Sequence, residues 1–341
     1  MRVLITGHTG FKGAWLSMWL AHQGHDVFGF ALEPEPGSLF ERAEVGSLMH
    51  QDVRGDVRDA ALVMGVVREF RPDVVVHMAA QSLVRPSYDN PRWTVETNVL
   101  GTLAVLEAVS AVESVKAALV VTTDKVYRDV DRVDGYTESD ALGGHDPYSA
   151  SKAMADILTS SWVSSFPGTA VAIARAGNVI GGGDINVDRL MPDVMRALKS
   201  GLSVQLRYPS AVRPWQHVLD CLAGYLVLTE ALLSGEGQGA WNFGPEPAAF
   251  RTVQETADLA TQIWGSGQAW VADAGEHPHE AEMLTLDASR ARSELGWRDR
   301  LDYQEAIEWT VEWEKRVHEG ESAREVSLKQ IAQFEALGRS S

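Results

Sequence analysis

The chain has very little cysteine, and this excludes two classes of protein. Cys221 is the single cysteine among 341 residues. An intrachain disulfide is therefore impossible, and a cysteine-rich metal site is excluded. Cys221 itself lies in the sequence VLDCLAGYLVL, whose apolar residues follow a helical pattern. We expect a packing role for this thiol, because a buried free cysteine usually behaves as a small hydrophobic side chain.

Long apolar runs and an excess of positive charge are also missing. No segment approaches the roughly 20 consecutive apolar residues that a membrane-spanning helix needs. The first residues, MRVLITGHTG, reach a glycine-rich turn after a short apolar run and do not resemble a secretory signal. The formal net charge of −17 disfavours nucleic acid and anionic membranes as partners. We therefore expect a cytoplasmic protein that acts on a small molecule.

Patterns of metal ligands are scarce as well. The sequence HPHE at residues 277–280 offers two histidines and a glutamate, but no third histidine lies nearby. Protein zinc sites use three or four such ligands. We expect a loop at this point and no bound metal.

What the sequence does contain is a regular alternation of strand and helix patterns. Short β-branched runs predict strands at 3–6, 26–30, 73–79, 117–122 and 170–175, and amphipathic stretches predict helices at 11–23, 60–70, 94–109 and 147–166. Continuous apolar strands separated by helices indicate a parallel sheet covered on both faces. The expected fold class is therefore α/β, with a doubly wound parallel (Rossmann) sheet.

The second half is less regular, with short runs at 203–206 and 240–243 among helical stretches. We assign residues 1–180 to a dinucleotide-binding Rossmann domain, to which later segments return. Residues 181–330 are assigned mainly to a smaller substrate-binding lobe, and residues 331–341 to a tail. The chain from Lys329 onward carries no strong pattern, and we expect it to fray.

A glycine-rich loop follows the first predicted strand and opens the first helix. It reads TGHTGFKG at residues 6–13, with glycines at 7, 10 and 13. Gly7 suits a tight turn, Gly10 permits close approach of a pyrophosphate, and Gly13 lets the helix pack against the strand. The helix N-terminus then offers free N–H groups to the phosphates. This context of strand, turn and helix predicts dinucleotide binding.

Proton-transfer groups gather in two later segments. TTDKVY at residues 122–127 follows an apolar strand, and YSASK at residues 148–152 begins a helix. Tyr148 and Lys152 are four residues apart and therefore face the same way. A tyrosine with an ordinary pKa near about 10 is a poor base at neutral pH, and an adjacent ammonium favours the phenolate. We expect Lys152 to lower the pKa of Tyr148, which would then take a proton from a substrate hydroxyl.

These motifs together resemble the extended short-chain dehydrogenase/reductase family, whose loop reads T-G-x-x-G-F-x-G and whose catalytic pair is Y-x-x-x-K. The resemblance implies adenine contacts at Asp56 and Val57, after the third strand, and cofactor contacts at the end of the fourth strand and in the next helix. The implied cofactor-binding residues are Gly7, Thr9, Gly10, Phe11, Lys12, Gly13, Asp56, Val57, Ala79, Ala80, Gln81, Asn98, Thr122, Tyr148 and Lys152. The second strand carries no acid at its tip, and Glu33 lies further along the chain. No arginine is found there that could bind a 2′-phosphate. The resemblance favours NAD over NADP.

The Thr123-Asp124-Lys125 triplet narrows the resemblance to one group of enzymes within this family. Epimerases of this family need only a serine or threonine at the strand end, whereas nucleotide-sugar 4,6-dehydratases add an acid and a further proton-transfer residue. Asp-Lys resembles the CDP-glucose 4,6-dehydratases, as do GHTGFKG at the loop, HMAAQ at residues 77–81, GGHDPYSASK at residues 143–152 and RPWQHVL at residues 213–219. The implied activity is that of an NAD-dependent lyase of deoxysugar biosynthesis, in which tightly bound NAD is regenerated in each cycle.

The resemblance also implies roles for five catalytic residues. Tyr148, with Lys152 beside it, removes the 4-hydroxyl proton, and Thr123 hydrogen-bonds the 4-oxygen. Asp124 is the acid for the departing 6-hydroxyl, and Lys125 is the base at C5. Two alternatives remain open: a 4,6-dehydratase or 4-epimerase acting on another nucleotide sugar, and a cofactor-sensing regulator without enzymatic activity.

The remaining expectations concern the substrate and the partners. By position in the resembled family, Asn178 contacts the diphosphate of the nucleotide sugar. Arg189 and Arg213 suit bidentate pairing with phosphate. Ser82, Arg85 and His217 complete the expected substrate-binding residues. The helices predicted at 94–109 and 147–166 are those through which this family forms dimers, so we expect a homodimer or homotetramer.

Overall fold

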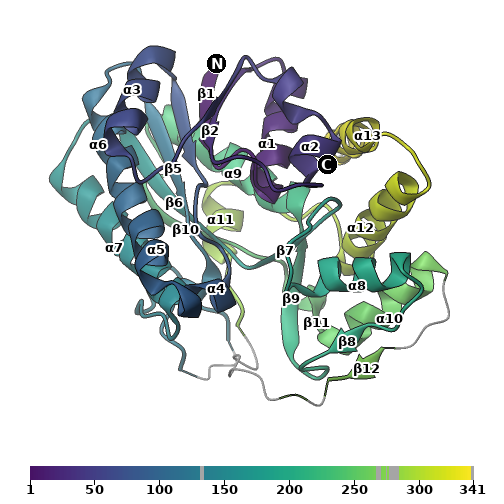
Figure 1. The fold of residues 1–341 in the computed structure, drawn as a ribbon. Coiled ribbons are helices and arrows are strands. Elements are labelled where there is room, and N and C mark those ends of the chain that lie inside the picture. The colour runs from purple at the N-terminus through teal and green to yellow at the C-terminus, as the bar shows by residue number, and fades with distance from the viewer. Residues whose placement is uncertain (131–133, 266–269, 274, 276–283, 339–341) are drawn as a thin grey trace.

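The centre of the molecule is a seven-stranded parallel sheet (Figure 1). The computed structural model describes residues 1–130, 134–265, 270–273, 275 and 284–338. The strand order is β10-β6-β5-β4-β1-β2-β3. The strands are β1 (Arg2–Thr6), β2 (Asp26–Ala31), β3 (Gln51–Arg54), β4 (Val74–His77), β5 (Ala117–Val121), β6 (Ala170–Ala176) and β10 (Gly239–Phe243). The order reverses between β1 and β4, and the carboxyl ends on either side of such a reversal form the ligand crevice of doubly wound sheets.

Helices cover both faces of this sheet because its strands are apolar on both sides. Leu4 of β1 packs into a core with α3 (Ala60–Phe70) and α6 (Gly101–Ala111), and α7 (Pro147–Ser165) lies beside α6. The neighbouring residues Val3 and Ile5 face the opposite core. There they meet α1 (Phe11–His22) and α9 (Val218–Leu233).

The smaller lobe has its own sheet and core. Its three-stranded sheet has the order β11-β9-β7, and a two-stranded pair joins β12 to β8. The elements are β7 (Asn178–Ile180), α8 (Leu190–Lys199), β8 (Gln205–Leu206), β9 (Val212–His217), β11 (Phe250–Thr252), α10 (Val253–Trp264), β12 (Val271–Ala272) and α12 (Tyr303–His318). Trp215, Met191 and Val311 are buried at the centre of this lobe.

Short elements connect these layers. They are α2 (Leu39–Arg42), the 3-10 turn η1 (Val45–Leu48), α4 (Val84–Asp89), α5 (Pro91–Val95), the π-helical turn η2 (Glu96–Leu100), the 3-10 turns η3 (Asp124–Val126) and η4 (Pro247–Ala249), and α11 (Ser289–Glu294). The helix predicted at 94–109 is thus a continuous run of α5, η2 and α6. In the part of the chain that the structure describes, no helix is both long and apolar enough to cross a membrane. Cys221 is fully buried in the core under α9, as its pattern predicts.

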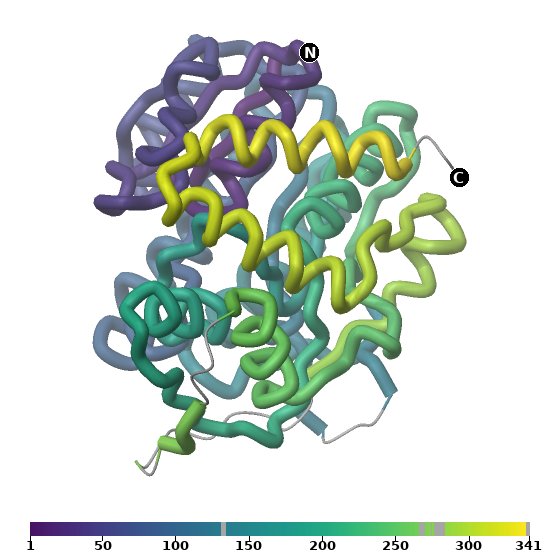
Figure 2. The backbone as a smooth tube through the Cα atoms, turned by 90° about the vertical axis from the view of Figure 1, so that its right-hand side faces the viewer, coloured from purple at the N-terminus to yellow at the C-terminus, as the bar shows by residue number. Residues whose placement is uncertain are grey.

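Two segments differ from the sequence expectation. Residues 240–243, expected among the short runs of the lobe, lie in β10, which pairs in parallel with β6 and completes the main sheet. Residues 329–337, expected to fray with the rest of the terminus, belong to α13 (Ala323–Leu337), which lies beside α12 across one side of the molecule (Figure 2). The fraying expectation is wrong for them because Ile331 and Phe334 are fully buried, with the Phe334 ring packing edge-on against Trp19 of α1. Residues 339–341 lie outside the described residues.

Candidate active site

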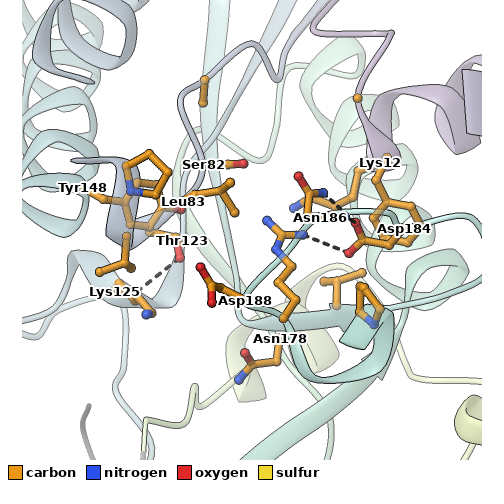
Figure 3. A pocket seen from close by; sticks show the side chains of 18 of the residues that line it. Lys12, Ser82, Leu83, Thr123, Lys125, Tyr148, Asn178, Asp184, Asn186 and Asp188 are labelled. Carbon is orange, nitrogen blue, oxygen red and sulfur yellow. Dashed lines mark hydrogen bonds and ion pairs between the residues drawn. The ribbon is translucent and has the colours of Figure 1, made fainter. Parts of the chain in front are cut away.

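A cavity of about 690 Å³ lies between the carboxyl ends of the main strands and the smaller lobe. Its walls come from the loops that follow β1, β4 and β5, from the first turns of α7, and from the segment between β7 and α8. Figure 3 shows Tyr148, Thr123 and Lys125 on one side of it, with Asn178, Asp184 and Asn186 opposite. The sheet and the lobe therefore both supply side chains to one site.

The glycine-rich loop shapes one end of the cavity. Gly7 has a φ of +77°, and a Cβ there would lie 2.7 Å from the Ala79 backbone nitrogen. A Cβ at Gly13 would lie 2.2 Å from the Gly7 oxygen. Gly10 differs, since the nearest atom to a Cβ there is the Gly7 oxygen at 3.4 Å. Protein packing thus requires Gly7 and Gly13, whereas Gly10 leaves open space at a cavity wall, next to the uncapped N-terminus of α1. This cradle fits a pyrophosphate.

Acidic side chains mark the far end of the same groove. Asp56, Val57 and Glu33 line it. The Glu33 carboxylate lies 3.3 Å from the Arg54 guanidinium, and Asp52 lies 2.8 Å from the same group. The expected gap at the tip of β2 is therefore filled by Glu33, although its side chain is 79% exposed. Arg54 is shared by two carboxylates, which makes it a poor partner for a 2′-phosphate.

The turn after β5 carries the acid and the amine predicted from the sequence. Thr123 is the N-cap of η3, and its hydroxyl donates to Asp124 Oδ1 at 2.8 Å. Asp124 is buried, whereas Lys125 is half-buried at the cavity wall. Burial raises the pKa of the Asp124 carboxyl, and this effect outweighs the opposing influences of Lys125 and the Thr123 hydroxyl. A raised pKa keeps a carboxylic acid protonated to higher pH, as a proton donor requires.

Helix α7 presents Tyr148 and Lys152 to the cavity. Asp146 caps the helix by accepting from the Ser149 amide. The Lys152 ammonium donates to the Val121 carbonyl at 2.8 Å, and burial, reinforced by Lys12, lowers its pKa to about 7. Burial raises the pKa of Tyr148 to about 12 despite a hydrogen bond with Thr123. The expectation that Lys152 lowers the Tyr148 pKa is therefore wrong for the chain alone, because desolvation of the phenol dominates.

Three predicted site residues lie behind the cavity wall. Gln81 donates to the Leu83 carbonyl and to Thr94. Asn98, in the π-helical turn, accepts from the Gln81 amide at 2.8 Å and donates to Ser151 Oγ at 2.8 Å. Both residues therefore brace the loop after β4 and helix α7, and their side chains do not face the cavity. An inserted residue in a helix often marks such a functional region.

His217 is the third predicted residue behind the cavity wall, and its position in the fold does not support the expected contact with substrate. The ring is buried, its Nδ1 accepts from the Leu219 amide at the start of α9, and its edge packs against Trp309. Burial lowers the pKa of His217 to about 3. The R-P-W-Q-H motif thus separates in space: Arg213 and Trp215 line the cavity, and His217 caps a helix. His217 is the last residue of β9 and already serves as the N-cap of α9, which the motif alone does not reveal.

The remaining predicted residues line the cavity, and the lobe adds several that the sequence analysis missed. Ser82, Arg85, Asn178, Arg189 and Arg213 are on its wall, as are Thr9, Phe11, Lys12, Ala79, Ala80 and Thr122. The missed residues are Asp184, Asn186, Asp188, Arg207 and Tyr208. Asp184 accepts from Asn186 and from Arg189 at 3.2 Å, dashed in Figure 3. For the first three missed residues, an available signal was the polar stretch DINVDR directly after three glycines.

The described residues hold no cluster of three or more histidine, cysteine, aspartate or glutamate side chains arranged to bind a metal. The segment 277–280, for which we expected a loop without metal, lies outside the described residues.

Comparison with known proteins places these features in a family. The GDP-mannose 4,6-dehydratase family matches residues 4–310 of the chain. A CDP-glucose 4,6-dehydratase of Salmonella typhimurium is 43% identical over 345 aligned positions, covering 98% of this chain and 96% of that protein. The structure of the dTDP-glucose 4,6-dehydratase DesIV from Streptomyces venezuelae, with NAD bound, superimposes with a TM-score of 0.79 at 28% identity, covering 93% and 98% of the two chains.

The fold of the chain is also similar to that of epimerases. The NAD complex of the UDP-glucose 4-epimerase from Thermus thermophilus has a TM-score of 0.79 at 26% identity, and covers 92% of this chain and 98% of that one. The predicted fold class is thereby confirmed. With its glycine cradle, its Tyr148/Lys152 pair and a family match across most of its length, the chain belongs to the GDP-mannose 4,6-dehydratase family of extended short-chain dehydrogenases/reductases.

Proposed function

We propose that this protein converts CDP-D-glucose into CDP-4-keto-6-deoxy-D-glucose with bound NAD. The observation that carries the proposal is the Thr123-Asp124-Lys125 turn, which lines one cavity together with Tyr148. An epimerase has no use for the added acid and amine. The 43% identity to a protein named CDP-glucose 4,6-dehydratase supports the choice of substrate.

The groove from Gly10 to Glu33 fits NAD. The diphosphate would lie on the uncapped N-terminus of α1, where free N–H groups and the helix dipole favour anions. Glu33 is available to the adenosine ribose hydroxyls, and Arg54 is already paired with Asp52 and Glu33. An added 2′-phosphate would meet two carboxylates there, which favours NAD over NADP.

Tyr148 is the group that we assign to the 4-hydroxyl. When bound, NAD⁺ supplies a hydride acceptor and a positively charged ring, and that charge favours the phenolate. The protein holds the Tyr148 phenol in a buried position beside Thr123, whose hydroxyl is available to the 4-oxygen. Lys152 lies within the same enclosed wall and is available to the nicotinamide ribose. Oxidation at C4 makes the C5 proton acidic, which prepares the elimination.

Asp124 and Lys125 then supply the acid and the base for the elimination of water. Lys125 takes the C5 proton as the C6–O bond breaks, and Asp124 donates a proton to the leaving hydroxyl, so that one water forms. The raised pKa of Asp124 suits this donation. Bound NAD would supply the hydride that reduces C6, and protonation of C5 would complete a cycle that leaves the cofactor unchanged and bound.

The lobe supplies the substrate side of the cavity. Arg189 and Arg213 would hold the diphosphate through planar, bidentate contacts, with Asn178 beside them. These guanidinium groups would offset the acidic net charge of the chain locally.

We also propose that the protein is a cytoplasmic homodimer or a pair of such dimers. Leu100 on η2 and Met154 and Ile157 on α7 are 51%, 41% and 54% exposed, although large apolar side chains usually find cover. Helix α7 packs beside α5, η2 and α6, so these side chains belong to one layer of helices. A second copy of the same layer would cover them by two-fold symmetry.

The decisive experiment offers the purified protein four substrates: CDP-glucose, dTDP-glucose, UDP-glucose and GDP-mannose. We expect a 4-keto product that has lost its 6-hydroxyl, by mass, from CDP-glucose. Turnover of dTDP-glucose alone would contradict the cytidine assignment and leave the chemistry standing. Epimerised sugar without loss of water would contradict the dehydratase assignment.

A further inference from the structure

A buried ion pair lies directly behind the turn that carries Asp124 and Lys125. Asp156 belongs to α7 and Arg175 to β6, and their side chains are 0% and 3% exposed. The contact is bidentate: Arg175 Nε donates to Asp156 Oδ2 at 2.8 Å, and a terminal guanidinium nitrogen donates to Oδ1 at 2.7 Å. Neither residue lines the cavity wall.

This pair contacts both ends of the turn. Thr122, the residue before it, donates its hydroxyl to Asp156 Oδ2 at 3.1 Å. Tyr127, the residue after it, accepts at its phenolic oxygen from Arg175 at 2.7 Å. The segment between these contacts contains Thr123, Asp124 and Lys125. The ion pair thus holds the residues on both sides of the proton-transfer groups. We call Asp156 and Arg175, with their contacts to Thr122 and Tyr127, the bracket.

The far side of the bracket is anchored to the last strand of the main sheet. The Tyr127 hydroxyl donates to Asn242 Oδ1 at 2.7 Å, and Asn242 Nδ2 donates to the Tyr136 carbonyl at 2.8 Å. The Tyr127 and Tyr136 rings stack with centroids 5.0 Å apart. A buried network whose members all have partners rigidifies its surroundings.

Stability alone is a weak reason for such a pair. Removing two charges from water costs as much as their attraction returns, so buried ion pairs are poor evidence of stabilisation. Their better-attested benefit is a unique local geometry. Asp156 also lies one helical turn after Lys152 on α7, so the same carboxylate links the helix that carries the Tyr148/Lys152 pair to the turn that carries the elimination groups.

We propose that Asp156, Arg175 and Tyr127 are positioning residues that hold the Asp124–Lys125 turn in register with Tyr148 and Lys152. This proposal rests on the proposed dehydratase function for its kinetic consequence. Oxidation at C4 depends on α7 and needs only Thr123 from the turn, whereas elimination depends on both Asp124 and Lys125. Loosening the bracket therefore slows elimination more than oxidation. A displacement of about 1 Å can cost roughly 10²-fold in rate.

Two conservative variants test this, because loss of Asp156 or Arg175 risks misfolding. Tyr127→Phe keeps the stacked ring and removes the hydroxyl, and Thr122→Val removes the other contact. The matched controls are Tyr303→Phe, whose hydroxyl contacts Thr256 in the lobe, and Thr159→Val, a buried hydroxyl of α7 that donates only to its own helix.

Each variant is mixed with the nucleotide sugar that the wild type dehydrates, and the reaction is quenched within one turnover. We expect about 10–100-fold lower kcat with little change in KM, and accumulation of a 4-keto nucleotide that still carries its 6-hydroxyl. The controls should show neither effect. An equal slowing of all steps, without that intermediate, would show a merely structural role and overturn the proposal.

A second measurement does not depend on the reaction. Hydrogen exchange of the backbone amides at residues 122–127 should accelerate in Tyr127→Phe and Thr122→Val and stay at the wild-type rate in both controls. Unchanged exchange in the two test variants would overturn the proposal even if the protein proved to catalyse another reaction. Absence of dehydration by the wild type would instead count against the proposed function, and the exchange result would still decide whether the bracket holds the turn.

Discussion

Asp188 Oδ1 lies 3.1 Å from the guanidinium of Arg85, which belongs to α4, and 3.3 Å from that of Arg207 in the smaller lobe. One carboxylate thus joins the two halves of the protein across the cavity. Its backbone has a φ of +64°, a left-handed conformation that aspartate and asparagine tolerate better than most residues. The carboxylate offsets part of the positive charge that these two cavity-lining arginines would otherwise present to an anionic ligand.

Replacing Asp188 with asparagine should therefore strengthen the binding of CDP. Asn keeps the backbone conformation and removes the competing charge. We expect Kd to fall by about 3–10-fold at low ionic strength, with a smaller gain at high salt because the contact is partly exposed. Titration calorimetry measures it. Asp258→Asn removes the same charge from an exposed position of α10, and an equal gain there would show a general charge effect.

Lys125→Met tests the base. Removal of the amine should lower the dehydration rate by about 10²–10⁴-fold, the usual contribution of a positioned proton-transfer group. The content of bound NAD should stay the same, because Lys125 lies on the substrate side of the turn. Product analysis and release of the bound nucleotide measure the two quantities. The control is Lys116→Met, at a side chain 69% exposed outside the cavity. Unchanged turnover in Lys125→Met would remove this residue from the mechanism.

The raised pKa of Asp124 predicts the basic limb of the pH profile. Burial favours the protonated acid, and the protonated acid is the form that donates to the leaving hydroxyl. The kcat of dehydration is therefore expected to fall as pH rises through this pKa, because Asp124 loses the proton that it donates. Asp124→Asn, which cannot donate a carboxyl proton, should lose about 10²–10⁴-fold in kcat and lose that limb as well. An identical limb in the variant would assign it to another group.

Lys152 should make folding stability depend on pH. Its pKa is depressed to about 7 in the folded chain, against 10.5 as a reference. Between these values the unfolded chain binds the additional proton, so the free energy of unfolding rises with pH in this window. Lys152→Met should thus abolish activity yet raise the melting temperature at and below pH 7, with a gain that shrinks toward pH 10.5. A variant less stable than wild type below pH 7 would contradict this.

Ile157→Glu tests the proposed dimer. A charge at this exposed apolar position of α7 would be buried against a second copy, which is costly. We expect sedimentation to show the mass of one chain instead of two or four. Val271→Glu, at a position of β12 that is 47% exposed in the lobe, should leave the assembly intact. Dimers that survive Ile157→Glu would place the contact on another surface.

The parts of the site that could be predicted from the sequence are those that a parallel sheet brings together by geometry. Gly7, Asp124 and Ala79 follow β1, β5 and β4, whose carboxyl ends lie at one edge of the sheet. Tyr148 and Lys152 were recognisable because their spacing puts both on one side of a helix. Local spacing and strand order are properties that a sequence pattern carries.

The parts of the site that could not be predicted depend on the direction in which a side chain points and on contacts between residues distant in the sequence. His217 shares a motif with Arg213 but caps α9 at the end of β9, and the Asn98 side chain is turned toward Gln81 and Ser151. Asp156 and Arg175 are 19 residues apart, on a helix and on the strand that follows it, and only the packed structure joins them. The pKa of Tyr148 could not be predicted for a similar reason, because desolvation depends on which groups surround the phenol.

The late return of the chain to the main sheet has a consequence for synthesis on the ribosome. Helix α9 covers β5 and β6, α13 packs on α1, and β10 completes the edge of the sheet beside β6, yet α13 ends only at Leu337. The nascent first half therefore emerges with the apolar face over β5 and β6 unshielded, although α1 already covers β1. A fragment that ends after residue 180 would keep that face bare and aggregate, so the nucleotide-binding half cannot be excised as an independent unit. Chaperone demand should accordingly persist until translation is nearly complete.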